Sequence, residues 1–331
     1  MKKIFTASLT AALVFGMGAE TFAEYDAERH SIGKFQWSAS LKADFVHRRP
    51  QYSYSHKYHI YLTPKYKFDE HLSLNGNVEF YGDYKKMRNE DPEFYLSGDY
   101  APWGFNVGLV PLYTNEGGMI FDTVMLGGAV SWGKDFGVRL YGGKIKDEEI
   151  ISRPSGEFSE DDANTTLVGL NLQYDTKKTG LYGGAGFYYL WDDQFRNEIY
   201  NSNGTIGAAE IWSVNAGYRF SKKFNVFATY AANEKAAPQE YIWKGQVSYG
   251  KCGSYPNRGD WMVYAGYTRY GTNLSYQGKD DDVTPGSRGF NCGLKYAPFR
   301  NVSLAVKYSK GELINSKKHT EKISGVVQIY F

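Results

Sequence analysis

Apolar and polar residues alternate from residue 34 to the end of the chain, in segments of about ten residues separated by breaks. Because the side chains of a β-strand point alternately to its two faces, each segment predicts a strand with one apolar and one polar face. Sixteen such segments can be counted, and because strand boundaries inferred from sequence are uncertain by about two to four residues, fourteen or eighteen strands stay open. The first segment carries Phe35, Trp37, Ala39, Leu41, Ala43 and Phe45 on one face and Gln36, Ser38, Ser40, Lys42 and Asp44 on the other.

The breaks between these segments alternate in length. Short ones lie at 69–71, 101–104, 133–135, 221–223 and 297–300, and long ones at 85–92, 112–123, 145–164, 192–210 and 271–288. The connection 250–260 departs from the rule, because it is long where a short one is expected. A transmembrane β-barrel has short periplasmic turns and longer outer loops, whereas a soluble sandwich has no reason to segregate loop length in this way. The alternation therefore indicates a membrane barrel with both of its ends on the side of the short turns.

The first residues are typical of a secretory signal peptide. Lys2 and Lys3 precede an apolar run over 4–19, and small residues before the expected cleavage point put the cut after Ala23. A membrane-anchoring helix is the alternative, but the run is short and interrupted by polar residues and glycines. We expect residues 1–23 to be removed and residues 24–331 to form a single barrel domain.

Composition narrows the class of protein further. The mean hydropathy of −0.51 argues against a helical membrane protein, but not against a barrel, in which only every second residue faces lipid. Aromatic residues make up 17% of the chain, as expected for girdles at two membrane interfaces. A net charge of +2 offers no electrostatic support for binding nucleic acid. Cys252 and Cys292 could pair in an oxidising compartment, but Cys292 shares its parity with outward-facing residues, so we expect two unpaired thiols.

The last strand, residues 320–331, places apolar side chains on one face and ends on an aromatic residue. This ending resembles the C-terminal strand of Gram-negative outer-membrane barrels, whose terminal Phe is recognised by the barrel assembly machinery. The resemblance implies export to the outer membrane, where membrane lipid and lipopolysaccharide surround the barrel, and an assembly signal at Tyr330 and Phe331. A half-buried edge strand of a soluble β-protein is the alternative.

The third long break contains Pro111, Glu116, Gly117, Gly118 and Asp122, and here the chain resembles the general diffusion porins. In that family the third outer loop folds into the lumen and forms the constriction of the pore. The resemblance implies an all-β, transmembrane, antiparallel up-and-down barrel of about 16 strands with an inward-folded third loop. It also implies a water-filled channel for small hydrophilic solutes and ions, and possible assembly as a homotrimer. The spacing between the proline and the acidic residue differs from the family pattern.

An ordinary surface loop is the alternative for this segment. The apolar run 119–121 would be unfavourable in water. Small residues at Gly108, Gly127, Ala129 and Gly143 on the inward parity would leave room for an infolded loop.

The inward parity carries more cations than anions. Because charge and width set the selectivity of a pore, a basic wall facing Glu116 and Asp122 predicts a transverse field and a weak preference for anions. The predicted wall consists of Lys42, Lys57, Lys65, Arg139, Arg219, Lys244, Lys295 and Lys307.

Catalysis inside a barrel would require a histidine beside a nucleophile or a carboxylate. His56 and His59 have a spacing that could suit a metal, but no Cys, Asp or Glu is placed beside them in the pattern, so we expect solvated loop histidines. No nucleotide loop or zinc signature is present. We expect no catalytic residue, metal or cofactor, and a barrel enzyme and a plugged structural or adhesive barrel stay open as alternatives.

Overall fold

The computed structural model describes residues 30–32, 34–49, 53–83, 87–114, 119–146, 164–191, 208–234, 241–271, 282–283 and 286–331. The predicted signal peptide lies outside this range. Within it, no helix has the length and apolar character needed to cross a membrane.

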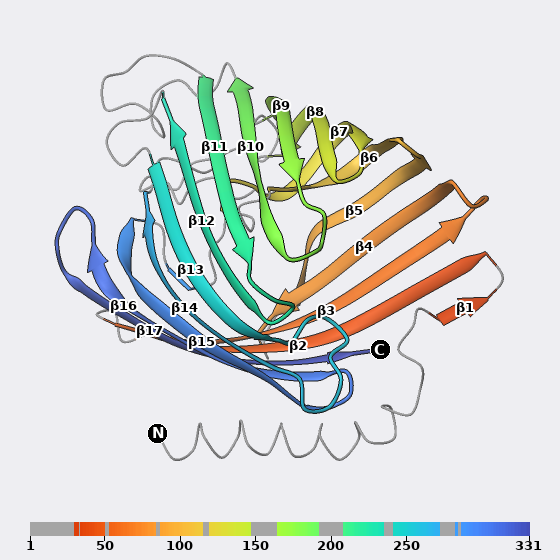
Figure 1. Cartoon of the computed structure of the whole chain (residues 1–331). Helices are drawn as coiled ribbons and strands as arrows, with labels where there is room; N and C mark the ends of the chain where they lie inside the picture. The colour runs from red at the N-terminus through yellow and green to blue at the C-terminus, as the bar shows by residue number, and fades with distance from the viewer. Residues whose placement is uncertain are drawn as a thin grey trace.

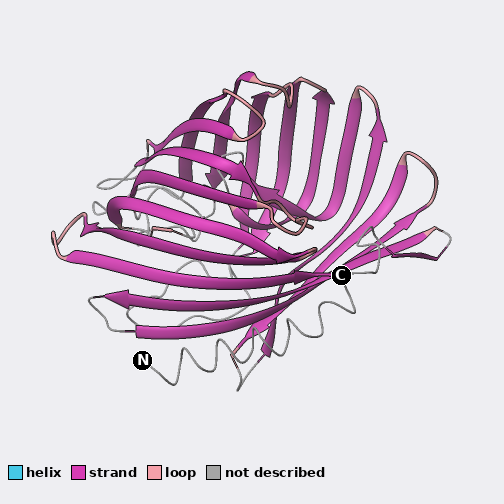
Figure 2. Cartoon of the chain, turned by 60° about the horizontal axis from the view of Figure 1, so that its bottom comes forward, coloured by secondary structure: helices cyan, strands magenta, loops and turns pink. Residues whose placement is uncertain are grey.

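The described chain is all-β and antiparallel, as predicted. A short strand β1 pairs with β2, each strand from β2 to β16 pairs with the next, and β17 pairs with β2. The pairing of β17 with β2 closes a barrel of sixteen strands, which Figures 1 and 2 show curving around a common axis. The strands are β1 (His30–Ile32), β2 (Phe35–Arg49), β3 (Ser53–Lys67), β4 (Leu72–Gly82), β5 (Met87–Tyr100), β6 (Trp103–Tyr113), β7 (Asp122–Gly133), β8 (Phe136–Lys146), β9 (Asn164–Tyr174), β10 (Gly180–Trp191), β11 (Ala208–Arg219), β12 (Phe224–Asn233), β13 (Tyr241–Lys251), β14 (Trp261–Tyr270), β15 (Ser287–Phe299), β16 (Val302–Leu313) and β17 (His319–Tyr330).

The predicted faces of the strands are confirmed, with the apolar side chains on the outside. Leu126 is 60% exposed, Leu181 62% and Phe290 71%, and large exposed apolar residues recur on the same parity in strands all round the barrel. A surface of this kind is unfavourable in water but suits lipid, where a closed barrel also satisfies every backbone hydrogen bond of its strands.

The predicted segregation of the connections by length holds only in part. The connections on the side of both barrel ends are short except for 252–260, the departure already visible in the sequence, whereas on the opposite side the connections after β2, β4 and β16 are as short as these turns. The connection 252–260 packs against its neighbours, because the Asn301 amide donates to the Pro256 carbonyl at 2.8 Å and the rings of Tyr255 and Tyr330 lie 5.0 Å apart.

Two predicted breaks are wrong in extent. The break at 85–92 shrinks to four residues between Gly82 and Met87, and the break at 112–123 shrinks to the residues between Tyr113 and Asp122. In both places backbone pairing with the neighbouring strand extends the ladder beyond the alternating pattern, into a mostly polar stretch at the start of β5 and as far as the pair Tyr113 and Asp122 between β6 and β7. Main-chain hydrogen bonding does not depend on side-chain type, and it sets the ends of these strands.

Both cysteines are free, as expected. Cys292 is exposed on the outer face of β15, whereas Cys252 is buried in the long turn after β13. Burial raises the pKa of the Cys252 thiol.

Candidate functional site

The third long connection lies inside the barrel, so the inward-folded loop is confirmed. Met119, Ile120 and Phe121 are at most 1% exposed, which excludes an ordinary surface loop. The ring of Phe121 packs edge-on against Tyr188 of β10, with centroids 5.1 Å apart at 73°.

The same segment reaches the far wall of the barrel. The Tyr270 hydroxyl on β14 donates to the carbonyl of Met119 at 2.9 Å. Because β14 lies seven strands from β7 one way round the closed sheet and nine the other way, this bond joins nearly opposite walls. The connection therefore crosses the interior instead of lining one side.

A second connection also turns inward, which the sequence did not indicate. Val283, in the connection between β14 and β15, is 4% exposed and joins the same apolar cluster. Beside it the Tyr264 hydroxyl donates to Oδ1 of the buried Asp282 at 2.7 Å. The run 280–282 is strongly acidic, and from sequence alone it suggests a solvated loop.

The apolar cluster occupies one half of the inner face. Its described members come from β6 to β14 and the two infolded connections, and none comes from β15–β17 or β2–β5. The cluster comprises Leu112, Met119, Ile120, Phe121, Met125, Ala129, Tyr141, Ile145, Leu167, Tyr188, Leu190, Ala209, Ile211, Ala231, Ile242, Tyr270 and Val283.

The other half of the inner face, from β15 through β17 to β5, is polar and charged. Strand register places on it the cations Lys42, Arg48, Lys57, Lys65, Lys67, Lys295, Lys307 and Lys322, and the anions Asp44, Glu79, Glu93 and Asp99. Among the side chains that the structure describes, cations therefore exceed anions on this half, but the acids are interspersed among them.

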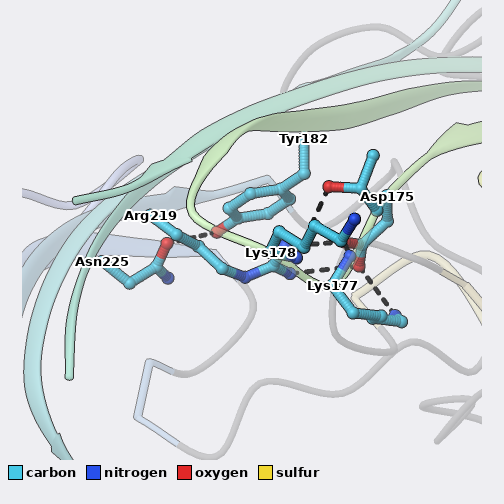
Figure 3. Close-up of polar contacts among 7 residues, drawn as sticks. Asp175, Lys177, Lys178, Tyr182, Arg219 and Asn225 are labelled. Carbon is cyan, nitrogen blue, oxygen red and sulfur yellow. Dashed lines mark hydrogen bonds and ion pairs between the residues drawn. The ribbon is translucent and has the colours of Figure 1, made fainter. Parts of the chain in front are cut away.

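Arg219 of the predicted basic wall is neutralised by a residue from a turn (Figure 3). Its Nη1 and Nη2 donate to Oδ1 and Oδ2 of Asp175 at 2.6 and 3.0 Å, and Lys177 Nζ reaches the same carboxylate at 2.7 Å. The guanidinium also lies 4.0 Å from the ring centroid of Tyr182, whose hydroxyl donates to Asn225 at 2.8 Å. The hydrogen bond from Arg219 holds the pKa of Asp175 well below its usual range. The arrangement braces the turn between β9 and β10 against β11.

The remaining predicted wall residues also lie on the inner face, in different surroundings. Lys42 pairs with Asp44 at 3.1 Å, and Lys295 donates to the carbonyl of Gly253 in the long turn at 3.2 Å. Two cations lie over aromatic rings, Lys57 at 4.8 Å from the ring centroid of Tyr81 and Arg139 at 5.0 Å from that of Tyr141. The others, Lys65, Lys244 and Lys307, lie on β3, β13 and β16.

The prediction that His59 is a solvated loop histidine is wrong. His59 lies in a strand and has carboxylates beside it. On the inner face of β3, its Nδ1 lies 2.5 Å from Glu79 Oε1 and its Nε2 3.2 Å from Asp44 Oδ2. The ring stacks between Tyr61 and Tyr81, with centroids 5.9 and 6.1 Å away. The prediction failed because pairing of β2, β3 and β4 joins residues fifteen and twenty positions apart in the chain. Each ring nitrogen faces a carboxylate, and in the described part of the chain no group of three His, Cys, Asp or Glu could hold a metal ion.

Comparison with known proteins identifies the architecture. No protein-family model and no curated protein matches the chain. Among solved structures, a mutant of the Rh. blastica porin matches at TM-score 0.55 with 10% identity, covering 90% of this chain and 100% of that one. Pseudomonas putida OprB at high pH matches at TM-score 0.61 with 8% identity, covering 90% of this chain and 94% of that one. The chain has the porin fold. At these identities the likeness concerns the fold alone, and any function has to be argued from the residues.

The predicted constriction residues of this porin-fold barrel are placed only in part. Pro111 lies near the end of β6, and Asp122 is the exposed first residue of β7, on the same strand parity as Leu126. Glu116, Gly117 and Gly118 lie outside the described residues, so the constriction role of this loop stays a prediction.

The predicted assembly signal lies at the barrel closure. Phe331 exchanges backbone hydrogen bonds with Ala39 of β2 at 2.8 and 3.3 Å, and Tyr330 pairs with Ser40. Its role in assembly also stays a prediction.

Proposed function

We propose that this chain is an outer-membrane porin, a water-filled channel through which small hydrophilic solutes and ions diffuse passively. A barrel of sixteen strands is too wide for wall side chains alone to fill. An apolar outer surface around a partly charged inner face is the arrangement that a lipid-embedded aqueous channel requires.

The route that we propose follows the polar half of the inner face, along β15–β17 and β2–β5. The observation that carries this proposal is the burial of Met119, Ile120 and Phe121 and the bond of this segment to Tyr270 on the opposite wall. Because the apolar cluster occupies the other half, hydrated solutes would pass between the infolded connection and the charged wall.

The excess of cations on that wall supports a weak preference for anions. The preference is moderated, because on this wall Asp44 neutralises Lys42, and in the other half of the barrel Asp175 neutralises Arg219 of β11. Glu116 is proposed to lie near the narrowest point, where low-dielectric walls focus its field on passing ions. Asp122, on the outward parity at the start of β7, would act on passing ions only from the rim.

The setting of the channel is part of the same proposal. Residues 1–23 would direct export, Tyr330 and Phe331 would engage the assembly machinery, and the barrel would sit in the outer membrane among lipid and lipopolysaccharide. A homotrimer is proposed on family resemblance alone. No catalytic step is invoked, because diffusion through an open channel needs none.

Planar-bilayer recording of the purified protein tests the channel. We expect stepwise ohmic conductance and a small reversal potential of the anion-selective sign in a salt gradient. Glu116→Gln combined with Asp122→Asn should raise anion selectivity and alter the single-channel conductance.

A matched control changes Glu70→Gln and Asp135→Asn in two short turns on the opposite side, and it should leave selectivity close to the wild-type value. Folded barrel without conductance would support a plugged structural barrel instead. An unchanged reversal potential after the first double substitution would place this loop away from the narrowest point.

A further inference from the structure

The long turn 252–260 lies against the inner face of the barrel, on the side where both barrel ends and the short turns lie. It is called here the mouth turn. Lys295 points inward from β15, and its Nζ donates to the carbonyl of Gly253 in the turn at 3.2 Å. Tyr330 points inward from β17, and its hydroxyl is hydrogen-bonded to the side chain of Ser254. Contacts from two strands that are separated by β16 therefore hold the turn across the inner wall.

Burial of the neighbouring side chains shows the same coverage. Ser303 of β16 faces inward and is only 2% exposed, and Ala297 near the end of β15 is fully buried. Small inward side chains in the wall of an uncovered channel would contact water. Cys252 and Pro256 of the mouth turn are themselves buried. The turn therefore packs directly on this part of the wall.

Backbone hydrogen bonds fix the second half of the mouth turn. The Gly259 amide donates to the Ala297 carbonyl, and the Ala297 amide donates to the Asp260 carbonyl, both at 2.8 Å. Within the turn, Oδ2 of Asp260 accepts from the Asn257 amide at 2.9 Å. The turn is thus a fixed part of this end of the barrel.

The strands beneath the mouth turn belong to the polar half of the inner face. The proposed route runs along β15–β17 and β2–β5, so a solute that follows it has to pass the turn. The third connection enters the barrel from the opposite end, between Tyr113 and Asp122. Two separate segments of the chain therefore lie along the same route.

Cations outnumber carboxylates around the mouth turn, among the residues that the structure describes. Lys307 is a diagonal neighbour of Lys295, because its register partner Gly293 lies two residues from Lys295 on the same face. Diagonal neighbours of this kind lie about 7–8 Å apart. Arg258 is an exposed residue of the turn, whereas the carboxylate of the turn, Asp260, already accepts a hydrogen bond from a turn amide. An anion at this end of the route would meet more positive than negative charge.

We propose that the mouth turn forms a second narrow passage in the channel, and that Lys295, Lys307 and Arg258 make this passage favour small anionic solutes such as carboxylates. The proposal rests on the proposed function, because it requires an open route along the polar half of the barrel. Lys295 has two roles in it, since its ammonium group holds the turn through Gly253 and supplies positive charge to the passage. Width and charge at a narrow point are the properties that set the selectivity of a pore.

Replacement of residues 252–260 by Asn-Gly tests the width of the passage. Lys251 and Trp261 are directly opposed in the ladder, and a two-residue type I′ turn joins such a pair. In planar bilayers the shortened protein should conduct at least roughly 1.5-fold better than the wild type, because a narrow passage would be removed. With neutral polyethylene glycol added to one chamber at a time, the largest polymer that enters a single channel should increase in size for one chamber only.

Point variants of Lys295 test the charge. Lys295→Met removes the ammonium group and its bond to the turn, and it should lower the ratio of anion to cation permeability at least roughly twofold. Lys295→Arg keeps a cation and a donor and should retain the wild-type ratio. The matched control is Lys222→Met, in the exposed turn after β11 on the same side of the barrel, and it should change neither conductance nor selectivity. The Lys295 variants also test the proposal if the shortened protein does not fold.

Unchanged conductance and polymer entry in a folded, shortened protein would overturn the proposal, because the turn would then lie outside the route. So would a wild-type permeability ratio in Lys295→Met, or an equal change in Lys222→Met. Absence of conductance in the folded wild-type protein would instead refute the proposed function, so the two failures can be told apart.

Discussion

Phe121 anchors the third connection inside the barrel, and its removal should release that connection. The side chain is fully buried and packs edge-on against Tyr188. Truncating a fully buried Phe to Ala costs about 3–5 kcal/mol, including roughly 0.5–1.5 kcal/mol from the aromatic pair. At about 1.4 kcal/mol per factor of ten, Phe121→Ala should lower the ratio of docked to undocked connection by roughly 100-fold to more than 1,000-fold.

Single-channel recording measures the consequence. Because the docked segment is proposed to narrow the route, Phe121→Ala should raise the mean conductance and the open-channel current noise, and it should lower the unfolding temperature. Tyr270→Phe, which removes the bond to the Met119 carbonyl, should act in the same direction with a smaller effect of about 0.5–1.5 kcal/mol on docking.

Phe187→Ala is the matched control, because Phe187 neighbours Tyr188 on β10 but faces outward and is 49% exposed. It should leave conductance and noise unchanged. If Phe121→Ala lowers stability while conductance and noise stay at wild-type values, the segment does not border the route, and the reasoning from the apolar cluster to the channel fails.

Two further predictions concern stability. Val214→Arg, on the outer face near the middle of β11, should destabilise the barrel by roughly 2–4 kcal/mol in urea unfolding from lipid vesicles, whereas Gln173→Arg on the inner face of β9 should be nearly silent; equal costs would invalidate the assigned faces. The lowered pKa of Asp175 means that the Asp175–Arg219 pair contributes stability above the ordinary aspartate pKa of about 3.9 and loses it as pH falls toward the folded-state value. Asp175→Asn should therefore be less stable than wild type at pH 7, with a difference that shrinks below about pH 4; a difference independent of pH down to 2 would contradict the ion-pair assignment.

Much of the architecture follows from the alternating pattern alone. In a barrel each strand faces lipid on one side and the interior on the other. Whether a side chain lies at an odd or an even position of its strand therefore predicts whether it faces lipid or the interior. The outward placement of residues such as Leu181 and Cys292 could thus be predicted without any knowledge of which strands pair. The alternation also predicted the strand number. The long connection 252–260 departs from the rule of short turns on its side, in the sequence as in the structure.

The pattern gave a signal at only one of the two long connections described as returning to the barrel interior. The apolar run 119–121 indicated an infolded loop, because three apolar residues in a row are unfavourable in water. Asp282 and Val283 carried no such signal, since a single apolar residue after an acidic run is compatible with solvent exposure. Only the structure shows that Tyr264 meets Asp282 and that Val283 completes the apolar cluster.

What the chain determines by itself is the environment of each side chain along a strand, because the period of two is a local property of extended backbone. What only the tertiary structure decided is which charges meet. The register of β2, β3 and β4 sets His59 between Asp44 and Glu79, and the turn after β9 carries Asp175 to Arg219. Such pairings depend on strand register and turn geometry, which bring together residues that lie far apart in the sequence. The net positive charge of the wall, when it is counted from parity alone, therefore exceeds the charge that a passing ion would meet.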